Sequence, residues 1–191
     1  MRQNPLTKPH VWLRVLETTD VHGHLMPYNY ASDQETESFG LARTATLLQK
    51  ARQEAPNTVL FDNGDFLQGS VLTDIATRAE AGWTEPNPVI AAMNSLNYDA
   101  GTLGNHEFNF GLPWLQNTLK EVQFPMVCAN ALMIGASQTG EETLLPPYTI
   151  LTRDLIDSAG ETHQVKIGVI GLLPPQITNC CLLYTSDAAD E

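Results

Sequence analysis

The sequence predicts an α/β fold in which helices connect the strands of a parallel sheet. Apolar runs at residues 12–19, 58–61 and 98–103 have the length and composition of strands, and segments of helical periodicity separate them. Strands and helices that alternate in short units are typical of parallel strands joined by crossover helices. The 191 residues are enough for one domain with a substantial core.

The first part of the chain is predicted to contain one strand and one helix. The predicted elements are a disordered lead-in at residues 1–10, a strand at 12–19, a polar loop at 26–37 and a helix at about 40–54. Leu41, Ala45 and Leu48 fall on one face of that helix, which predicts its buried side. Ser38 is the predicted cap of the first turn.

The middle of the chain contains the clearest helix start. The predicted elements are a strand at 58–61, an ambiguous segment at 69–83 that combines a short helix with a loop, a helix from residue 87 and a strand at 98–103. Asn87 is a favourable N-cap, and Pro88 suits the first helical position. Val89, Met93 and Leu96 are expected on the buried face of this helix.

The last part of the chain is predicted to end in a hairpin. The predicted elements are a helix from residue 113, a strand at 125–129, and two strands at 148–153 and 164–170. Leu115, Leu119 and Val122 are expected to face inward from the helix. The turn-forming residues 157–160 predict that the last two strands pair with each other.

The charge balance limits the kind of partner. The net charge is −12, from 22 acidic and 10 basic residues, whereas a surface that binds polymeric nucleic acid needs a basic stripe. A small anionic substrate remains compatible with this charge, because bound dications would supply local positive charge. The three cysteines form neither a disulfide framework nor a zinc-ligand spacing.

No apolar run is long enough to span a bilayer, and residues 1–10 contain no apolar core of a signal peptide. We therefore expect no membrane association and no signal peptide in this sequence.

Three of the apolar runs end in polar residues of the kinds that bind metals. The motif D-x-H occupies residues 20–22, G-D occupies 64–65, and G-N-H-E occupies 104–107. Ligand sites in open α/β sheets lie outside the carboxyl ends of the strands, so these three ends are expected to converge. Taken singly, each residue has a simpler interpretation as a turn former, a helix cap or a surface histidine. The combination of all three favours a metal site.

The ordered set of motifs resembles the metallophosphoesterase superfamily. The stretches at 17–20, 39–45, 62–70 and 104–111 are similar to the 5'-nucleotidase family, and within it to bacterial 2',3'-cyclic-nucleotide 2'-phosphodiesterase/3'-nucleotidase. The resemblance implies a four-layer αββα sandwich, of which residues 11–177 would form the N-terminal part of the catalytic domain. It also implies a hydrolase that acts on small nucleotide phosphoesters through a metal-bound hydroxide. A monomer in the periplasm or cell envelope is expected by the same resemblance.

The resemblance assigns roles at a site with two divalent metal ions. Asp20 and His22 would hold the first ion, Asp65 would bridge both ions, and Asn105 would bind the second. His106 would stabilise the phosphoryl charge or protonate the leaving oxygen. The metal stays open among Mn, Zn, Co and Mg, because dinuclear sites rich in oxygen and nitrogen accept several dications.

Further polar residues near the motifs are candidates for substrate binding or for shaping the loops. His24 is expected to face substrate or solvent, and Asn130 to contact substrate or to cap backbone. Asn109 is a substrate-binding candidate that also separates two branches, because the 5'-nucleotidases usually have Asp at this position. Asp62 is expected to shape its loop, and Glu107 to form hydrogen bonds within its own loop.

The sequence departs from the family pattern in its last part. The superfamily places further histidine ligands in G-H and G-H-x-H motifs, but His163 is the only histidine after His106 and lies in neither. The fold is therefore expected to be C-terminally truncated, and residues 178–191 to be a non-native tail. The alternatives are a 5'-nucleotidase of the same family and an inactive metal-binding fragment.

Overall fold

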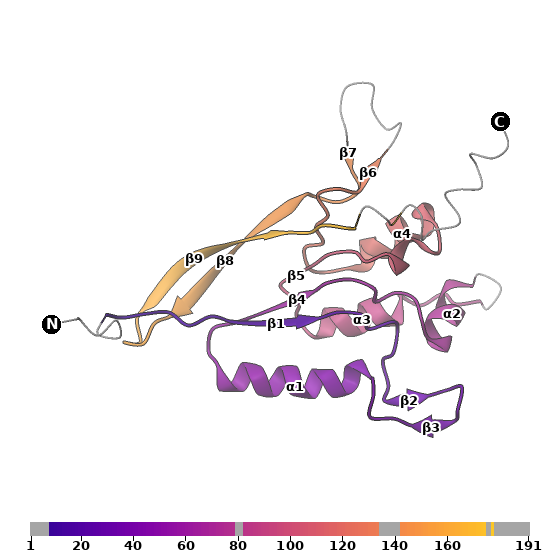
Figure 1. Ribbon diagram of the computed structural model, residues 1–191, viewed down its shortest axis with the longest axis horizontal. Coiled ribbons are helices and arrows are strands. Elements are labelled where there is room, and N and C mark those ends of the chain that lie inside the picture. The colour runs from indigo at the N-terminus through magenta and orange to yellow at the C-terminus, as the bar shows by residue number, and fades with distance from the viewer. Residues whose placement is uncertain (1–7, 79–81, 134–141, 175–176, 178–191) are drawn as a thin grey trace.

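The centre of the molecule is a three-stranded parallel sheet. The structure, a computed structural model, describes residues 8–78, 82–133, 142–174 and 177. Strands β1 (Arg14–Thr18), β4 (Thr58–Asp62) and β5 (Ala100–Gly101) pair in the order β1-β4-β5, and both pairings are parallel. The predicted parallel sheet is confirmed, and the carboxyl ends of its strands meet at one edge (Figure 1).

Helices and smaller β-structures surround this sheet. The helices are α1 (Leu41–Glu54), α2 (Val71–Thr77), α3 (Pro88–Ser95) and α4 (Leu112–Thr118), with short 3-10 helices η3 (His106–Phe108) and η4 (Leu119–Glu121). The other strands are β2 (Tyr28–Asn29), β3 (Gln34–Glu35), β6 (Leu132–Met133), β7 (Glu142–Thr143), β8 (Tyr148–Ile156) and β9 (Thr162–Ile170). Each of these pairs with its neighbour in sequence as a two-stranded antiparallel sheet.

The core lies between the sheet and the helices. Leu60 of β4 is fully buried and belongs to the same apolar cluster as the side chains of α1 and α3. Leu41 and Leu48 lie seven residues apart, so both fall on the side of α1 that contributes to this cluster. Asn87 caps α3 as predicted, because its side chain accepts hydrogen bonds from the backbone N–H groups of Val89 and Ile90. The hydrophobic periodicity of the sequence therefore identified the packing side of both helices.

Two local predictions near α1 are wrong. Ser38 does not cap the helix: the N-cap is Gly40, and no side chain forms a capping hydrogen bond. Gly40 has φ 125°, and a Cβ there would lie 2.8 Å from the backbone N of Pro27, so the chain passes too close for any larger residue. The polar loop at residues 26–37 also contains β2 and β3, whose pairing joins two residues of each strand.

The two later strands of the predicted sheet are shorter than expected. Only Ala100–Gly101 is regular strand within residues 98–103, and residues 125–129 contribute a single parallel bridge between Met126 and Gly101. The backbone partners beyond that bridge change from residue to residue: the N–H of Cys128 donates to Pro146, and the N–H of the next residue to Gly171. A ladder needs consecutive partners on one strand, so residues 125–129 cross several segments without forming one.

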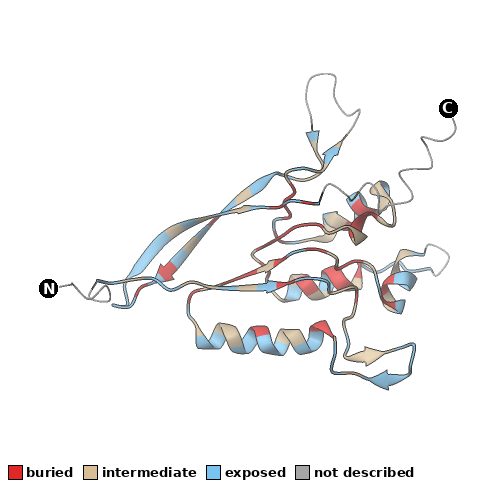
Figure 2. Cartoon of the chain, in the orientation of Figure 1, coloured by how far each residue is buried: buried red, intermediate tan, exposed pale blue. Residues whose placement is uncertain are grey.

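The predicted hairpin is confirmed and is longer than expected. Its strands β8 and β9 pair from Tyr148 with Ile170 to Ile156 with Thr162, and Figure 2 shows that most of this arm is exposed or half-buried. Asn57 connects the hairpin to the sheet, because its side chain donates to the carbonyls of Trp12 and Ile156 and accepts from the N–H of Ile156.

Two of the domain predictions, the lead-in and the non-native tail, concern the ends of the chain. Within the predicted lead-in, the carbonyl of His10 accepts a hydrogen bond from the N–H of Ser158 in the hairpin turn. Residues 1–7 and 178–191 lie outside the described residues, so the lead-in and the non-native tail stay predictions.

Candidate metal centre

Two of the strand-end loops run side by side and are joined through their backbones. The N–H of Asp20 donates to the carbonyl of Gly64 at 3.0 Å, and that of His22 donates to Asp65 at 2.9 Å. In the other direction, the N–H of Asn63 donates to Thr18 at 2.9 Å. These bonds continue the β1–β4 pairing past the last strand residues, and they fix the two loops relative to each other.

Three residues in these loops have left-handed backbone conformations without being glycine. The φ angles are 54° for Asp20, 47° for His22 and 59° for Asp65. Such angles are uncommon for side chains with a Cβ and are retained where the surrounding structure imposes them. Three of them in two adjoining loops indicate that the orientation of these side chains is maintained at a cost in backbone energy.

A buried carboxylate joins the second loop to the third. Glu107 is fully buried and accepts four backbone hydrogen bonds of 2.7–2.9 Å, which come from the N–H groups of Asp65, Phe66, Leu67 and Gly104. Burial raises the pKa of this carboxyl, while the hydrogen bonds from Leu67, Gly104 and Asp65 oppose the shift. Glu107 forms the bond expected within its own loop, and it also fixes the backbone on both sides of the site.

Glycines allow the same two loops to approach each other. A Cβ on Gly64 would lie 2.8 Å from the Cα of Gly104, and a Cβ on Gly104 would lie 2.7 Å from the backbone N of Asp65. Real Cβ atoms do not come this close to backbone atoms. The contact between the loops therefore requires glycine at both positions.

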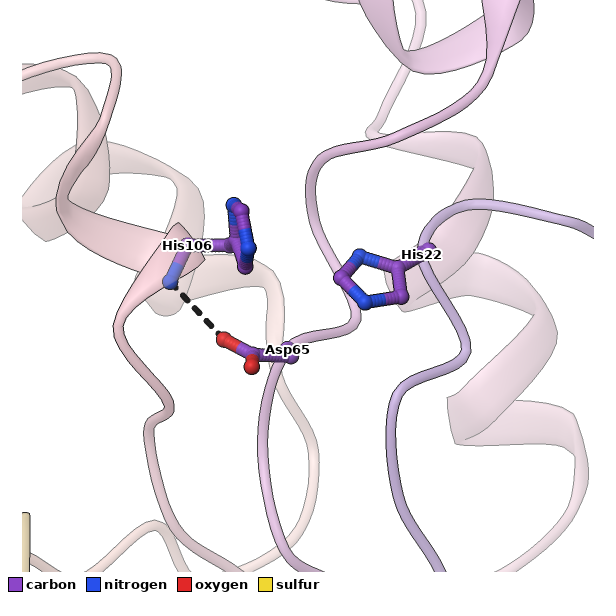
Figure 3. A group of neighbouring side chains, drawn as sticks. All are labelled: His22, Asp65 and His106. Atoms are coloured by element: carbon purple, nitrogen blue, oxygen red, sulfur yellow. Dashed lines mark hydrogen bonds between the residues drawn. The ribbon is translucent and has the colours of Figure 1, made fainter.

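Side chains from all three loops meet at the edge of the sheet. One ligand atom of each of His22, Asp65 and His106 lies within 4.8 Å of the other two, and Figure 3 shows the three side chains facing a common space. The His22 and His106 rings meet edge to face, with centroids 5.0 Å apart. The Oδ1 of Asp65 accepts a hydrogen bond from the backbone N–H of His106 at 2.8 Å.

Asp20 and Asn105 flank this group. The Oδ1 of Asp20 lies 3.5 Å from the Nε2 of His22, so a cation between these two atoms would replace a weak contact with two ligand bonds. Asn105 directly precedes η3, between Gly104 and His106, and its side chain is half-buried. Imidazole nitrogens, carboxylate oxygens and an amide oxygen suit borderline and hard dications, so the residues present fit a divalent metal.

His106 contacts two amide side chains. Its Nδ1 lies 2.8 Å from the Oε1 of Gln68 and 3.0 Å from the Nδ2 of Asn109. The Nδ2 of Asn109 also donates to the Oε1 of Gln68. The backbone carbonyl of Gln68 in turn contacts the Nδ1 of His22 at 2.8 Å. No local sequence pattern indicates a role for Gln68, because its contacts join loops far apart in the chain.

A second polar network lies beneath the loops. Asp62 is buried; it accepts a hydrogen bond from the hydroxyl of Thr18 at 2.5 Å and another from the N–H of Gly64 at 2.9 Å. Burial raises the pKa of Asp62 to about 7, although the bonds from Thr18 and Gly64 oppose this. The Thr18 hydroxyl also contacts the hydroxyl of Tyr98 at 2.7 Å, and burial raises the pKa of Tyr98 to about 12. Asp62 shapes its loop, as predicted.

The two remaining candidates lie outside the group of three. The ring of His24 packs on Phe39 at a centroid distance of 4.1 Å, and burial followed by the charge of His22 lowers the pKa of His24. The side chain of Asn130 donates to the carbonyl of Leu173 and accepts from its N–H, at 2.7 and 2.8 Å. This is the backbone contact that the sequence left open as an alternative for Asn130. Substrate-binding roles for His24 and Asn130 stay predictions.

The comparison with known families decides the membership of this chain. The pattern of the calcineurin-like phosphoesterase family matches residues 13–165. This chain belongs to the calcineurin-like phosphoesterases. The fold class predicted from the sequence is that of this family, and the candidate metal centre lies at the strand-end loops of its parallel sheet. Calcineurin-like phosphoesterases use divalent metals, in agreement with the residues gathered here.

Individual relatives cover most of this chain. It is 49% identical over 173 residues to the trifunctional nucleotide phosphoesterase protein YfkN of Bacillus subtilis and 44% identical over 172 residues to the 2',3'-cyclic-nucleotide 2'-phosphodiesterase/3'-nucleotidase of Haemophilus influenzae. These matches cover 88% and 89% of this chain. The 5'-nucleotidase of Bos taurus is 36% identical over 154 residues, which is 78% of this chain. The crystal structure of YfkN superimposes with a TM-score of 0.80 at 47% identity, over 89% of this chain and 51% of that one.

The relatives themselves are longer proteins. This chain spans 12% of the length of the Bacillus subtilis protein and 25% of the Haemophilus influenzae and Bos taurus proteins. No helix among the described residues is both long and apolar enough to cross a membrane.

Proposed function

We propose that this chain contributes to the hydrolysis of nucleotide phosphoesters, with 2',3'-cyclic nucleotides and 3'-nucleotides as substrates and two divalent metal ions as cofactors. The observation that carries the proposal is the meeting of His22, Asp65 and His106, with Asp20 beside them, at the carboxyl edge of a phosphoesterase sheet. The names of the bacterial relatives support the substrate class. The expected periplasmic or cell-envelope location belongs to the same proposal.

The residues are proposed to divide into ligands and a group that acts on the phosphate. Asp20, His22 and Asp65 would hold the first ion, and Asp65 with Asn105 would supply part of the second ion's ligands. Metal ions in such a site stabilise the negative charge that develops on the phosphate oxygens and lower the pKa of bound water. His106 would stabilise phosphoryl charge or donate a proton to the leaving oxygen.

Asn109 supports the cyclic-nucleotide branch over the 5'-nucleotidase branch. Its Nδ2 lies 3.0 Å from the Nδ1 of His106, so the residue at this position contacts the proposed catalytic ring directly. A carboxylate here would stabilise a positively charged imidazole, whereas a neutral amide does not. The ability of His106 to take up and give a proton therefore depends on the residue at position 109, and Asn109 makes it differ from a protein with Asp there, which the resemblance implies for 5'-nucleotidases.

The test measures hydrolysis of 2',3'-cyclic AMP, 3'-AMP and 5'-AMP in Mn²⁺. It uses the 191-residue chain and a chimera in which residues 13–165 replace the aligned segment of the Bacillus subtilis protein. The chimera is included because it provides any ligands that lie outside the match. We expect the chimera to hydrolyse the cyclic and 3' substrates in preference to 5'-AMP. A folded chimera that binds Mn²⁺ and hydrolyses only 5'-AMP would contradict the proposed branch, and one that hydrolyses none would contradict the function.

A variant of the chimera separates the two proposed roles, metal binding and action on the phosphate. His106→Asn should lose turnover and keep its metal content, since His106 is assigned to the phosphate and not to an ion. Metal analysis of the purified variant checks this, and the loss of one equivalent of metal would move His106 into the ligand set.

A further inference from the structure

We propose that Gln68 is a positioning residue that fixes the ring tautomers of His22 and His106, using its backbone carbonyl for one ring and its side-chain carbonyl for the other. The inference rests on the proposed function for the roles of the two histidines. It goes beyond that function in assigning to one residue the orientation of both a proposed metal ligand and the proposed catalytic group.

The backbone carbonyl of Gln68 determines the tautomer of His22. It lies 2.8 Å from the Nδ1 of His22, and a carbonyl oxygen can only accept a hydrogen bond. The Nδ1 therefore carries the proton, which leaves a lone pair on the Nε2, the nitrogen that lies 3.5 Å from Asp20. Histidine ligands in metal sites commonly use one nitrogen for the metal while the other donates to a carbonyl. Gln68 prepares His22 for this arrangement.

The backbone on both sides of Gln68 is fixed, so its carbonyl has little freedom to move. The N–H of Leu67 donates to the buried carboxylate of Glu107 at 2.9 Å. A Cβ on Gly69 would lie 2.8 Å from the Cβ of His22, so the chain passes in close contact with the histidine that it orients.

The side-chain carbonyl of Gln68 determines the tautomer of His106. Its Oε1 lies 2.8 Å from the Nδ1 of His106 and also accepts from the Nδ2 of Asn109. The Asn109 contact keeps the oxygen of the Gln68 amide on this side, because the opposite orientation would place two NH₂ groups against each other. The Nδ2 of Asn109 also lies 3.0 Å from the Nδ1 of His106 and can only donate, so this contact by itself favours the opposite tautomer. The Oε1 of Gln68 lies closer, at 2.8 Å, so the Nδ1 is assigned as a donor to Gln68, and the Nε2 is the nitrogen available to exchange protons with a substrate.

This division predicts that the two effects can be separated by mutation. Gln68→Ala removes the side-chain carbonyl and keeps the backbone carbonyl, so it should release His106 and leave His22 in place. Gln68→Asn should act in the same way, because its amide is one methylene too short to reach His106. Gln68→Glu keeps an oxygen acceptor at the same reach and should retain the His106 tautomer. Gln49→Ala on the exposed side of α1 is the matched control.

The experiment is long-range ¹H–¹⁵N correlation of the histidine rings in the 191-residue chain, at a pH where the imidazoles are neutral. We expect both rings to be in the Nδ1–H form in the unmodified chain, in Gln68→Glu and in Gln49→Ala. In Gln68→Ala and Gln68→Asn, His106 should shift toward the Nε2–H form, because the Nδ2 of Asn109 can then donate to its Nδ1, while His22 stays in the Nδ1–H form. An unchanged His106 spectrum in both of these variants would overturn the proposal. So would a His106 that is already in the Nε2–H form in the unmodified chain, because its Nδ1 would then accept from Asn109.

A Mn²⁺ titration of the same samples separates this proposal from the proposed function. Gln68→Ala should bind Mn²⁺ within about threefold of the unmodified chain, because the contact that orients His22 is retained. Loss of binding in this variant, with the His22 tautomer unchanged, would contradict the division of roles. If the unmodified chain and the chimera both fail to bind Mn²⁺ but the chain shows the expected tautomers, the proposed function fails and the assignment of Gln68 stands.

Discussion

The strand-end loops and the β8–β9 hairpin are stabilised in different ways. The hairpin is exposed over most of its length and is held by a regular ladder of nine residue pairs (Figure 2). A few backbone hydrogen bonds join the first two loops beyond the strands, and a single buried carboxylate, Glu107, accepts four further N–H groups of the second and third loops. A ladder distributes stability over many weak contacts, whereas the loops concentrate it in a few residues. Substitutions in the loops should therefore cost far more than substitutions in the hairpin.

The largest effect is expected at Glu107. Glu107→Ala leaves four backbone N–H groups without their acceptor, at about 1–3 kcal/mol for each buried donor that water does not reach. We expect the free energy of unfolding to fall by about 4–6 kcal/mol, measured by urea denaturation. Glu161→Ala in the exposed hairpin turn is the control and should change it by no more than about 0.5 kcal/mol. Equal effects of the two substitutions would contradict the claim that the strand-end loops and the hairpin are stabilised in different ways.

The next effect depends on pH and is expected at Asp62. Its pKa is raised from 3.8 to about 7, so between these pH values the folded protein binds more protons than the unfolded chain. Stability must then fall as pH rises through this window, by up to about 4 kcal/mol for a shift of this size.

Asp62→Asn tests this assignment because the amide imitates the protonated acid. Its oxygen can accept from the N–H of Gly64, and its NH₂ group can donate to the hydroxyl of Thr18. We expect the variant to match the unmodified chain below about pH 4 and to be more stable than it at pH 8. Urea denaturation across this range measures the difference. A variant that follows the pH dependence of the unmodified chain would show that Asp62 is not the source of the slope.

A smaller effect is expected where the loops touch. Gly104→Ala would place a Cβ 2.7 Å from the backbone N of Asp65, so one loop has to shift. We expect a loss of about 1–3 kcal/mol in unfolding free energy. The same shift should lower the affinity for Mn²⁺, because Asp65 moves with its loop. Calorimetric titration of the variant measures the affinity, and an unchanged value would mean that the close contact does not position Asp65.

The smallest effect is expected at Gly168, the glycine of the hairpin that serves as the counterpart of Gly104. Gly168→Ala adds a Cβ with no atom within 4 Å, at a residue without a positive φ. Alanine loses less conformational freedom than glycine on folding, so the variant should gain about 0.5–1 kcal/mol. Thermal denaturation checks the sign, and a loss of stability comparable to that of Gly104→Ala would contradict the contrast between the regions.

The sequence predicted those features that depend on neighbours in the chain. The cap at Asn87, the buried face of α1 and the hairpin turn follow from local periodicity and turn chemistry, and the structure contains all three. The motifs at the strand ends also predict that His22, Asp65 and His106 lie at one edge of the sheet, and the structure brings these three side chains together.

The remaining features depend on contacts between distant segments. Gln68 and His106 lie 38 residues apart, and no local sequence pattern indicates that the side-chain oxygen of Gln68 contacts the His106 ring. The Ser38 cap was wrong because Gly40, packed against Pro27, starts the helix. The strand at 125–129 was wrong because its backbone partners belong to several segments, although its apolar pattern is that of a strand.

The most direct test of the metal centre is calorimetric titration of Mn²⁺ into the 191-residue chain and two variants. Asp65→Asn removes the carboxylate shared by the proposed ligand sets, and Asp154→Asn removes an exposed carboxylate from the hairpin as the control. We expect one tight equivalent in the unmodified chain and in Asp154→Asn, with affinity reduced at least about tenfold in Asp65→Asn. Equal affinity in all three proteins would contradict the assignment of the strand-end loops as a metal centre.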